Sequence, residues 1–220
     1  MRGIVVLDYD LTLLDNKLDF YMAFAETLSH YKGKVPDYST FIELLNKNML
    51  DKIIPPYVDF NEFWRMFRRT YRTKYLRLRA EAERSLLTLK NFGIITVIVT
   101  GREIHKQHVL ADLDMLGLRD YIDAIYTLAD LEYFNEREEF LFDKSAIITR
   151  AVRNFGLQPE RGVCIGDFLT DLYSCERAGL VFIGLNDDHE RNAILKKAGA
   201  KYVVDNLLDA TYLALKLIGV

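Results

Sequence analysis

Short apolar runs alternate with longer amphipathic stretches over most of this chain. The apolar runs are Gly3–Leu7, Ile94–Val99, Ala124–Tyr126, Val163–Ile165, Val181–Ile183 and Tyr202–Val204. The amphipathic stretches among the later runs are Glu103–Leu116, Lys144–Phe155, Leu169–Ala178, His189–Ala198 and Leu207–Leu217. Continuous apolar runs of this length are typical of strands that are buried on both faces. Their alternation with helices predicts an α/β fold, a Rossmann-like parallel sheet core with helices on both faces.

The pattern changes between about Leu18 and Leu89, where apolar residues recur with helical spacing. One face of the first predicted helix carries Tyr21, Phe24, Leu28 and Tyr31. Because Gly3–Leu7 already belongs to the sheet, this block is an insertion after the first strand. We therefore predict an α/β core of residues 1–14 and 84–220 and an inserted α-helical cap of residues 15–83.

Two further helices of the predicted cap have identifiable starts. Thr40-x-x-Glu43 has the spacing of a capping box, which opens a helix. Pro55-Pro56 then interrupts the chain, and Asp59 is placed to cap a long helix. The aromatic stripe of that helix is Phe60, Trp64, Phe67, Tyr71 and Tyr75.

Polar residues follow three of the predicted strands at the point where each strand ends. Asp8 and Asp10 follow the first strand, Thr100-Gly101-Arg102 follows the second, and Gly166-Asp167 follows the strand at Val163–Ile165. Ligands of open parallel sheets bind at the carboxyl ends of the strands. We therefore expect these groups to meet at one edge, within reach of Asp171 and Lys144, which stand in the first turns of two predicted helices.

The charge expected at this edge indicates chemistry on a phosphate. Crowded carboxylates either raise their pKa values or bind a cation, and an all-oxygen ligand set suits Mg²⁺. Asp8 and Asp10 are two residues apart, so at a regular strand end their side chains point the same way. One carboxylate can then attack while the other handles the proton. Thr100 and Lys144 offer hydrogen-bond donors to a transferring phosphoryl group.

These residues resemble four motifs of the haloacid dehalogenase-like hydrolase superfamily, and the resemblance spans the whole chain. The motifs are Asp8-x-Asp10-x-Thr12, the strand-end Thr100, Lys144, and Gly166-Asp167-x-x-x-Asp171. The helical insertion resembles the cap of the subgroup that carries its cap after the first motif. The chain departs from the pattern at Leu11, where the family often has glycine, and at Ser145, where proline often follows the lysine.

The resemblance implies a Mg²⁺-dependent phosphatase that acts on a small phosphomonoester through an aspartyl-phosphate. In that scheme Asp8 is the nucleophile, and Asp10 protonates the leaving oxygen and then activates water. Mg²⁺ would be held by the Asp8 carboxylate, the backbone carbonyl of Asp10 and Asp167. The presence of Asp10 favours phosphate esters over cleavage of carbon–halogen bonds.

The same resemblance assigns roles to the remaining motif residues. Thr100 and Lys144 would hold the phosphoryl oxygens, and Asp171 would orient Lys144 or a metal-bound water. Thr12 and Gly101 are supporting positions. Two simpler interpretations stay open: the Thr100 hydroxyl bonds its own backbone, and Asp171 complements a helix dipole.

Two other functions fit parts of the sequence. A phosphomutase of the same superfamily would return the phosphoryl group to its product. A catalytically silent protein could instead use the basic segment Arg65–Arg79 to hold an anionic partner such as RNA. We favour a solvated helix face for this segment, and a solvated loop for the acidic stretch Glu132–Glu139.

Composition limits the partners and the cellular location that we expect for the chain. The net charge is −3, with a pI near 5.9, so there is no bulk attraction to nucleic acid or anionic membrane. The apolar runs are too short to span a bilayer, and Met1–Asp8 reaches a carboxylate too soon for a signal peptide. The two cysteines make no disulfide framework, so we expect a cytoplasmic location. The expected partner is a small phosphorylated metabolite, with phosphoglycolate-like acids, sugar phosphates and nucleoside monophosphates all open.

Overall fold

A computed structural model describes residues 3–220; the first two residues of the predicted core and of the Met1–Asp8 segment lie outside the described part. The described chain contains a six-stranded sheet in the order β3-β2-β1-β4-β5-β6, in which all neighbours pair in parallel. The strands are β1 (Ile4–Leu7), β2 (Ile95–Thr100), β3 (Ala124–Thr127), β4 (Gly162–Gly166), β5 (Val181–Leu185) and β6 (Tyr202–Val204). The predicted α/β fold is confirmed.

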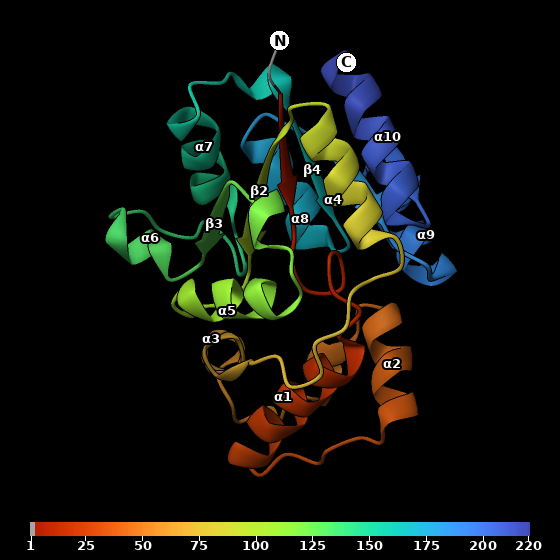
Figure 1. The fold of residues 1–220 in the computed structure, drawn as a ribbon. Helices are drawn as coiled ribbons and strands as arrows, with labels where there is room; N and C mark the ends of the chain where they lie inside the picture. Colours follow the sequence, from red (N-terminus) through yellow and green to blue (C-terminus); the bar gives the residue numbers. More distant parts are fainter. Residues whose placement is uncertain (1–2) are drawn as a thin grey trace.

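Helices cover both faces of the sheet (Figure 1). They are α4 (Ala82–Asn91), α5 (Gln107–Met115) and α10 (Leu207–Ile218) on one face, and α6 (Asp130–Tyr133), α7 (Ser145–Asn154), α8 (Leu169–Arg177) and α9 (His189–Lys197) on the other. Alternate residues of β1 serve the two sides: Val5 and Leu7 pack with the first group, Ile4 and Val6 with the second. Burial of both faces explains why the strands are continuous apolar runs.

The strand order places a crevice beside β1. From β1 the chain proceeds to β2 and β3, and it then crosses back to β4 on the other side of β1. The connections leaving β1 and β4 therefore run in opposite directions, and in such sheets this point is where ligands bind. Asp8 lies here, with its backbone N–H donating to the carbonyl of Ile165 at 2.9 Å.

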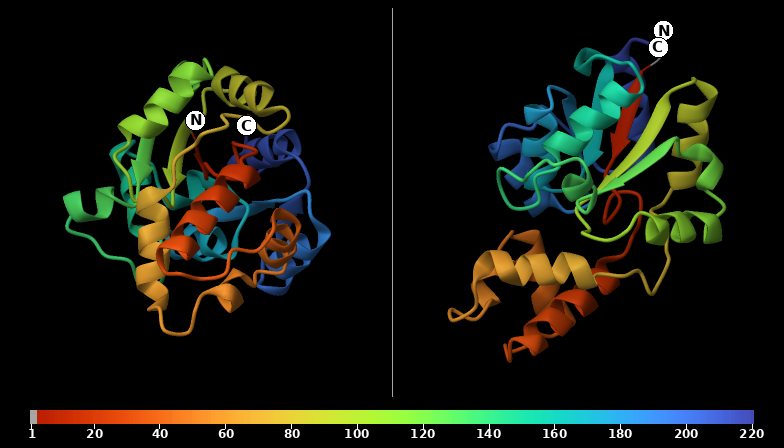
Figure 2. Two further views of the ribbon diagram at one scale, coloured as in Figure 1. Left: turned by 90° about the horizontal axis from the view of Figure 1, so that it is seen from below. Right: turned by 90° about the vertical axis from the view of Figure 1, so that its left-hand side faces the viewer.

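The inserted helices form a separate layer beyond the carboxyl edge of the sheet (Figures 1 and 2). We use the name cap for α1 (Lys17–His30), α2 (Tyr38–Asn46), the 3₁₀ helix η1 (Leu50–Ile53) and α3 (Phe60–Thr70). The segments entering and leaving the cap lie side by side, with an antiparallel bridge between Leu14 and Leu78. The division of the chain at residues 14/15 and 83/84 stays a prediction.

The cap has an aromatic core of its own. Phe24 and Leu28 are fully buried on the predicted inner face of α1. The ring of Phe24 packs 5.3–5.6 Å, centroid to centroid, from the rings of Phe41, Phe63 and Trp64. Edge and tilted ring contacts of this kind add to the stabilisation that burial provides.

Three predicted helix limits are wrong. The second cap helix begins at Tyr38, because Asp37 is its N-cap and accepts a hydrogen bond from the Thr40 N–H at 2.9 Å; Thr40 caps nothing. The predicted long helix ends at Thr70, and Tyr75 lies outside it because the Asp19 carboxylate takes the N–H groups of the returning segment. Helix α5 begins at Gln107 instead of at residue 103. None of the helices in the described part of the chain combines the length and apolarity needed to cross a membrane.

Candidate active site

Lys144 is the cationic centre of the candidate site. It stands immediately before α7 and is 4% exposed. Its Nζ donates a hydrogen bond to Oδ1 of Asp8 at 2.6 Å and makes an ion pair with Asp171. Three segments therefore meet at one charged cluster: Asp8 follows β1, Lys144 precedes α7, and Asp171 lies in the first turn of α8.

Three carboxylates surround this lysine. Oxygen atoms of Asp8, Asp167 and Asp171 lie within 4.8 Å of one another. The Thr12 hydroxyl bridges two of them, at 3.3 Å from Asp8 Oδ2 and 3.4 Å from Asp167 Oδ1. This is an all-oxygen donor set of the kind that Mg²⁺ prefers.

The hydrogen bonds of Asp171 distinguish it from the other two carboxylates. Its Oδ2 accepts from the backbone N–H groups of Asp167 and Phe168, at 3.1 and 3.0 Å, and its Oδ1 faces Lys144. Most of its acceptor capacity is therefore already in use. Asp8 and Asp167 are the residues that could hold a metal, while Asp171 positions Lys144 and the backbone of the turn.

A glycine makes this arrangement possible. A Cβ atom at Gly166 would lie 2.6 Å from Cβ of Asp171 and 2.8 Å from its Oδ2. Only glycine lets the carboxylate approach the end of β4 so closely. At the other turn, Leu11 adopts the left-handed conformation with a φ of 59°, which is the conformation that favours glycine.

Burial and charge shift the pKa values of the cluster. Burial raises the pKa of Asp8 well above its ordinary range, and Lys144 opposes this rise. Burial also raises the pKa of Asp167, although the nearby Arg191 guanidinium acts in the opposite direction. Burial lowers the pKa of Lys144, but the Asp171 and Asp8 carboxylates outweigh it, so Lys144 stays protonated.

Asp10 faces a residue to which the sequence analysis assigned no role. Its carboxylate accepts from Nε and Nη2 of Arg102, at 2.9 and 2.5 Å, and from the Asn16 amide at 2.6 Å. Arg102 is almost fully buried, with its guanidinium 4.3 Å from the ring centroid of Tyr71. Its position directly after Thr100-Gly101 was the available signal, since a charged residue at a strand end points to the binding edge.

Thr100 contributes to the Asp10 pocket. Its fully buried hydroxyl donates to Asp10 Oδ2 at 3.4 Å and accepts from the backbone N–H of Arg102 at 3.2 Å. The Thr100 hydroxyl therefore bonds to the local backbone, which is the simpler of the two predicted roles. Its contact with a phosphoryl group stays a prediction. Gly101, the next residue, lines the cavity described below.

Arg191 is a second residue that the sequence did not reveal. It lies in the first turn of α9, and its Nη2 donates to Oδ2 of Asp167 at 2.6 Å. The two residues are 24 positions apart, and the sequence before α9 carries none of the recognised motifs. Only the folded sheet brings this cation to the acidic cluster.

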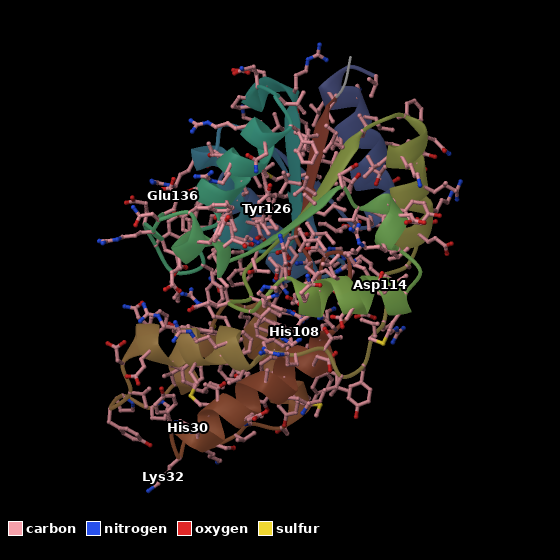
Figure 3. The ribbon with its side chains drawn as sticks, turned by 60° about the vertical axis from the view of Figure 1, so that its left-hand side comes forward. His30, Lys32, His108, Asp114, Tyr126 and Glu136 are labelled. Atoms are coloured by element: carbon pink, nitrogen blue, oxygen red, sulfur yellow. The ribbon has the colours of Figure 1, made fainter. Side chains whose placement is uncertain are left out.

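The cluster lies at the bottom of a cavity of about 350 Å³ between the core and the cap. Asp8, Asp10, Lys144 and Asp167 line its floor, and side chains of α1, α2, η1 and α3, with core side chains such as Phe168, form its other walls. Figure 3 shows His108 of α5 at the junction of the two layers, with His30 and Lys32 at the far end of the cap. The cap and the core thus shield the reacting groups on two sides, and the cavity stays open to solvent near the exposed Asp51.

The basic segment Arg65–Arg79 does not form one continuous helix face. Helix α3 ends at Thr70, so the segment is part helix and part extended chain. Arg68 is buried and donates to Glu103 at 2.6 Å and to both oxygens of Glu138 at 2.6–2.7 Å. Glu138 therefore joins the cap to the core, while the rest of the stretch Glu132–Glu139 is largely exposed, as predicted. Within the basic segment only Arg68 is withdrawn from solvent; Arg65, Arg69, Arg72, Lys74 and Arg77 are exposed.

Comparisons with known proteins agree with this geometry. A family model described as haloacid dehalogenase-like hydrolase matches residues 5–185. A phosphoglycolate phosphatase of Aquifex aeolicus is 26% identical over 189 residues, which cover 80% of this chain and 81% of that protein. PpaX of Caldanaerobacter subterraneus, named for pyrophosphatase activity, is 22% identical over 216 residues, which cover 92% of this chain and 90% of that protein.

The fold is shared with solved structures. A crystal structure from Clostridium acetobutylicum, described as that of a predicted phosphatase, superposes with a TM-score of 0.73. It is 20% identical, and the match covers 98% of this chain and 100% of that one. By the extent of the family match and by its fold, the chain belongs to the haloacid dehalogenase-like hydrolase family.

Proposed function

We propose that this chain is a Mg²⁺-dependent phosphatase that hydrolyses a small phosphomonoester through an aspartyl-phosphate on Asp8. The observation that carries the proposal is the Asp8 carboxylate at the floor of a cavity, held by Lys144 and adjoined by Asp167. The names of the curated relatives, a phosphoglycolate phosphatase and a pyrophosphatase, support a phosphorylated small substrate.

The first half of the reaction transfers the phosphoryl group to the enzyme. An oxygen of Asp8 bonds to phosphorus while the bond between phosphorus and the ester oxygen breaks. Asp10, which lines the same cavity, acts in its protonated form: one oxygen stays hydrogen-bonded to Arg102, and the other gives its proton to the departing alcohol. Lys144 stabilises the negative charge on the transferring oxygens.

The second half restores the enzyme. Asp10 accepts a proton from a water molecule, whose oxygen bonds to phosphorus as the bond to Asp8 breaks. Inorganic phosphate then leaves and Asp8 is again a carboxylate. The cap shields its side of the site from bulk water, and Asp10 positions the water that meets the aspartyl-phosphate.

The residues present fit a divalent cation at the cluster. Three carboxylates lie beside one lysine and one arginine, so a negative charge remains uncompensated. Asp8 and Asp167 would hold the ion, with the Asp10 carbonyl as the third ligand that the family resemblance implies. A bound Mg²⁺ would neutralise charge on the phosphate oxygens.

Removal of the metal is expected to abolish phosphate release, and addition of Mg²⁺ to restore it. The Mg²⁺ concentration for half-maximal rate should fall as the pH rises, by at most about tenfold per pH unit. The reason is that burial raises the pKa of Asp8, so protons compete with the cation for this carboxylate. The measurement is initial rate against Mg²⁺ concentration at several pH values, and a half-saturation point that rises with pH contradicts the assignment.

The proposed function is tested by a screen of metabolite phosphates, with and without Mg²⁺, in which free phosphate is measured. A phosphatase releases one phosphate per substrate consumed, whereas the alternative phosphomutase yields isomerised ester and little free phosphate. A chain that releases no phosphate from any ester contradicts the proposal. The cytoplasmic location stays a prediction. It agrees with Cys164 and Cys175, which are free thiols.

A further inference from the structure

The upper wall of the cavity is aromatic. The rings that line it belong to Phe20, Phe60, Trp64, Phe67, Tyr71, Phe142 and Phe168. Four leucines also line the cavity: Leu11, Leu45, Leu50 and Leu141. A substrate whose phosphate reaches Asp8 must therefore place its alcohol against apolar, largely planar surfaces.

The same wall offers no free cation. Arg68 is 4% exposed and is ion-paired with both Glu103 and Glu138. The other cations lining the cavity are likewise paired with carboxylates: Arg102 with Asp10, Arg191 with Asp167, and Lys144 with Asp8 and Asp171. Among the described lining residues, none is left to pair with a second anionic group. Burying such a group without a partner is strongly unfavourable.

The polar groups of the wall are few. Asp51 and Asn48 lie at its exposed end, where Asp51 adds a negative charge. The Tyr71 hydroxyl is buried and has no hydrogen-bond partner within the described chain. Burial raises the pKa of Tyr71, and the nearby Asp10 carboxylate raises it further. Thr170 adds a second hydroxyl to the lining, so a substrate meets two hydroxyl groups, whereas a polyhydroxy sugar needs many partners.

Building on the proposed phosphatase function, we propose that the substrates of this chain are phosphomonoesters of aromatic alcohols that carry no second anionic group. The phosphate lies at Asp8 and Lys144, and the aromatic ring of the alcohol lies against Trp64 and Phe67. Phosphoglycolate, the substrate for which the Aquifex aeolicus relative is named, ends in a carboxylate. In this cavity that carboxylate would meet rings and paired arginines.

The test compares esters of similar chemical reactivity. The probes are 2-phenylethyl phosphate, its para-carboxylate derivative, glucose 6-phosphate and 2-phosphoglycolate, each assayed with Mg²⁺ and the full chain. We expect kcat/KM for 2-phenylethyl phosphate to exceed that for each of the others by at least about thirtyfold. The para-carboxylate derivative is the matched probe, because it changes only the charge on the ring.

Binding can be measured without turnover. Trp64 is the chain's single tryptophan and lines the cavity, so its fluorescence reports directly on the aromatic wall. In the Asp8→Asn variant, 2-phenylethyl phosphate should change this emission saturably, with a Kd at least about tenfold lower than that of 2-phosphoglycolate.

A cap variant checks that the aromatic wall produces the preference. Phe60 lines the cavity but is 45% exposed, so Phe60→Ser should fold. We expect it to lower the ratio of kcat/KM for 2-phenylethyl phosphate over methyl phosphate by about tenfold. The matched control is Phe92→Ser, since Phe92 is 54% exposed at the end of α4 and should leave that ratio unchanged.

The outcomes separate this inference from the function on which it rests. A preference for 2-phosphoglycolate or glucose 6-phosphate overturns the aromatic assignment and leaves the phosphatase intact. An equal effect of Phe60→Ser and Phe92→Ser also overturns it. No Asp8-dependent phosphate release from any ester overturns both proposals.

Discussion

Asp8→Asn is expected to lower phosphate release by at least about 10⁴-fold, which is the size of loss seen when a catalytic nucleophile is removed. The amide keeps the shape of the side chain but cannot form the bond to phosphorus. The variant should still fold, because it removes one of three crowded carboxylates and leaves Lys144 paired with Asp171. The measurement is kcat/KM for the best ester of the screen, together with Tm.

Asp114→Asn is the matched control for this change. Asp114 is exposed on α5 and should alter kcat/KM by no more than about twofold, as surface substitutions do (Figure 3). If Asp8→Asn retains the parent rate while Asp114→Asn behaves as expected, Asp8 is not the nucleophile. A loss in both variants would instead indicate a general effect on the fold.

Lys144→Met is expected to damage both catalysis and stability. Asp8 and Asp171 would lose the cation they share in a buried cluster, and breaking a buried pair costs about 3–5 kcal/mol of unfolding free energy. Loss of a positive charge at the transferring phosphoryl group should lower kcat by about 10²–10³-fold. Urea denaturation and steady-state kinetics measure the two effects.

Added Mg²⁺ should recover part of the lost stability of Lys144→Met, because the cation replaces charge at the same carboxylates. Lys106→Met is the control, since Lys106 is exposed at the start of α5 and makes no such pair in the described chain. A Lys144→Met variant as stable and active as Lys106→Met would remove Lys144 from the site.

The sheet and the core of the site could be predicted because their signals are local. Each strand is buried on both faces, so an unbroken apolar run marks it, and the residue that ends the run marks the binding edge. Asp8 and Asp167 follow such runs directly, and the structure brings their carboxylates together. Lys144 follows no such run, and only its place at the start of a predicted helix, in the order of the family's motifs, identified it.

The rest of the site depends on contacts between distant segments. Arg191 meets Asp167 because β5 and β4 are neighbours, and nothing in the residues around Arg191 expresses that pairing. Helix α3 has a helical pattern that continues past its end at Thr70, and the backbone leaves the helix where Asp19 captures the N–H groups of Lys74 and Tyr75. Tertiary hydrogen bonds thus override a local preference.

The most direct test of the account is to identify the residue that carries phosphate during turnover. The enzyme would be mixed with substrate and Mg²⁺, quenched in acid within milliseconds, and reduced with borohydride, which converts an aspartyl-phosphate to homoserine. Peptide mass spectrometry should find this conversion at position 8, and Asp8→Asn should show none. Phosphate on any other residue, or turnover with no phosphorylated protein at any quench time, would contradict a mechanism centred on Asp8.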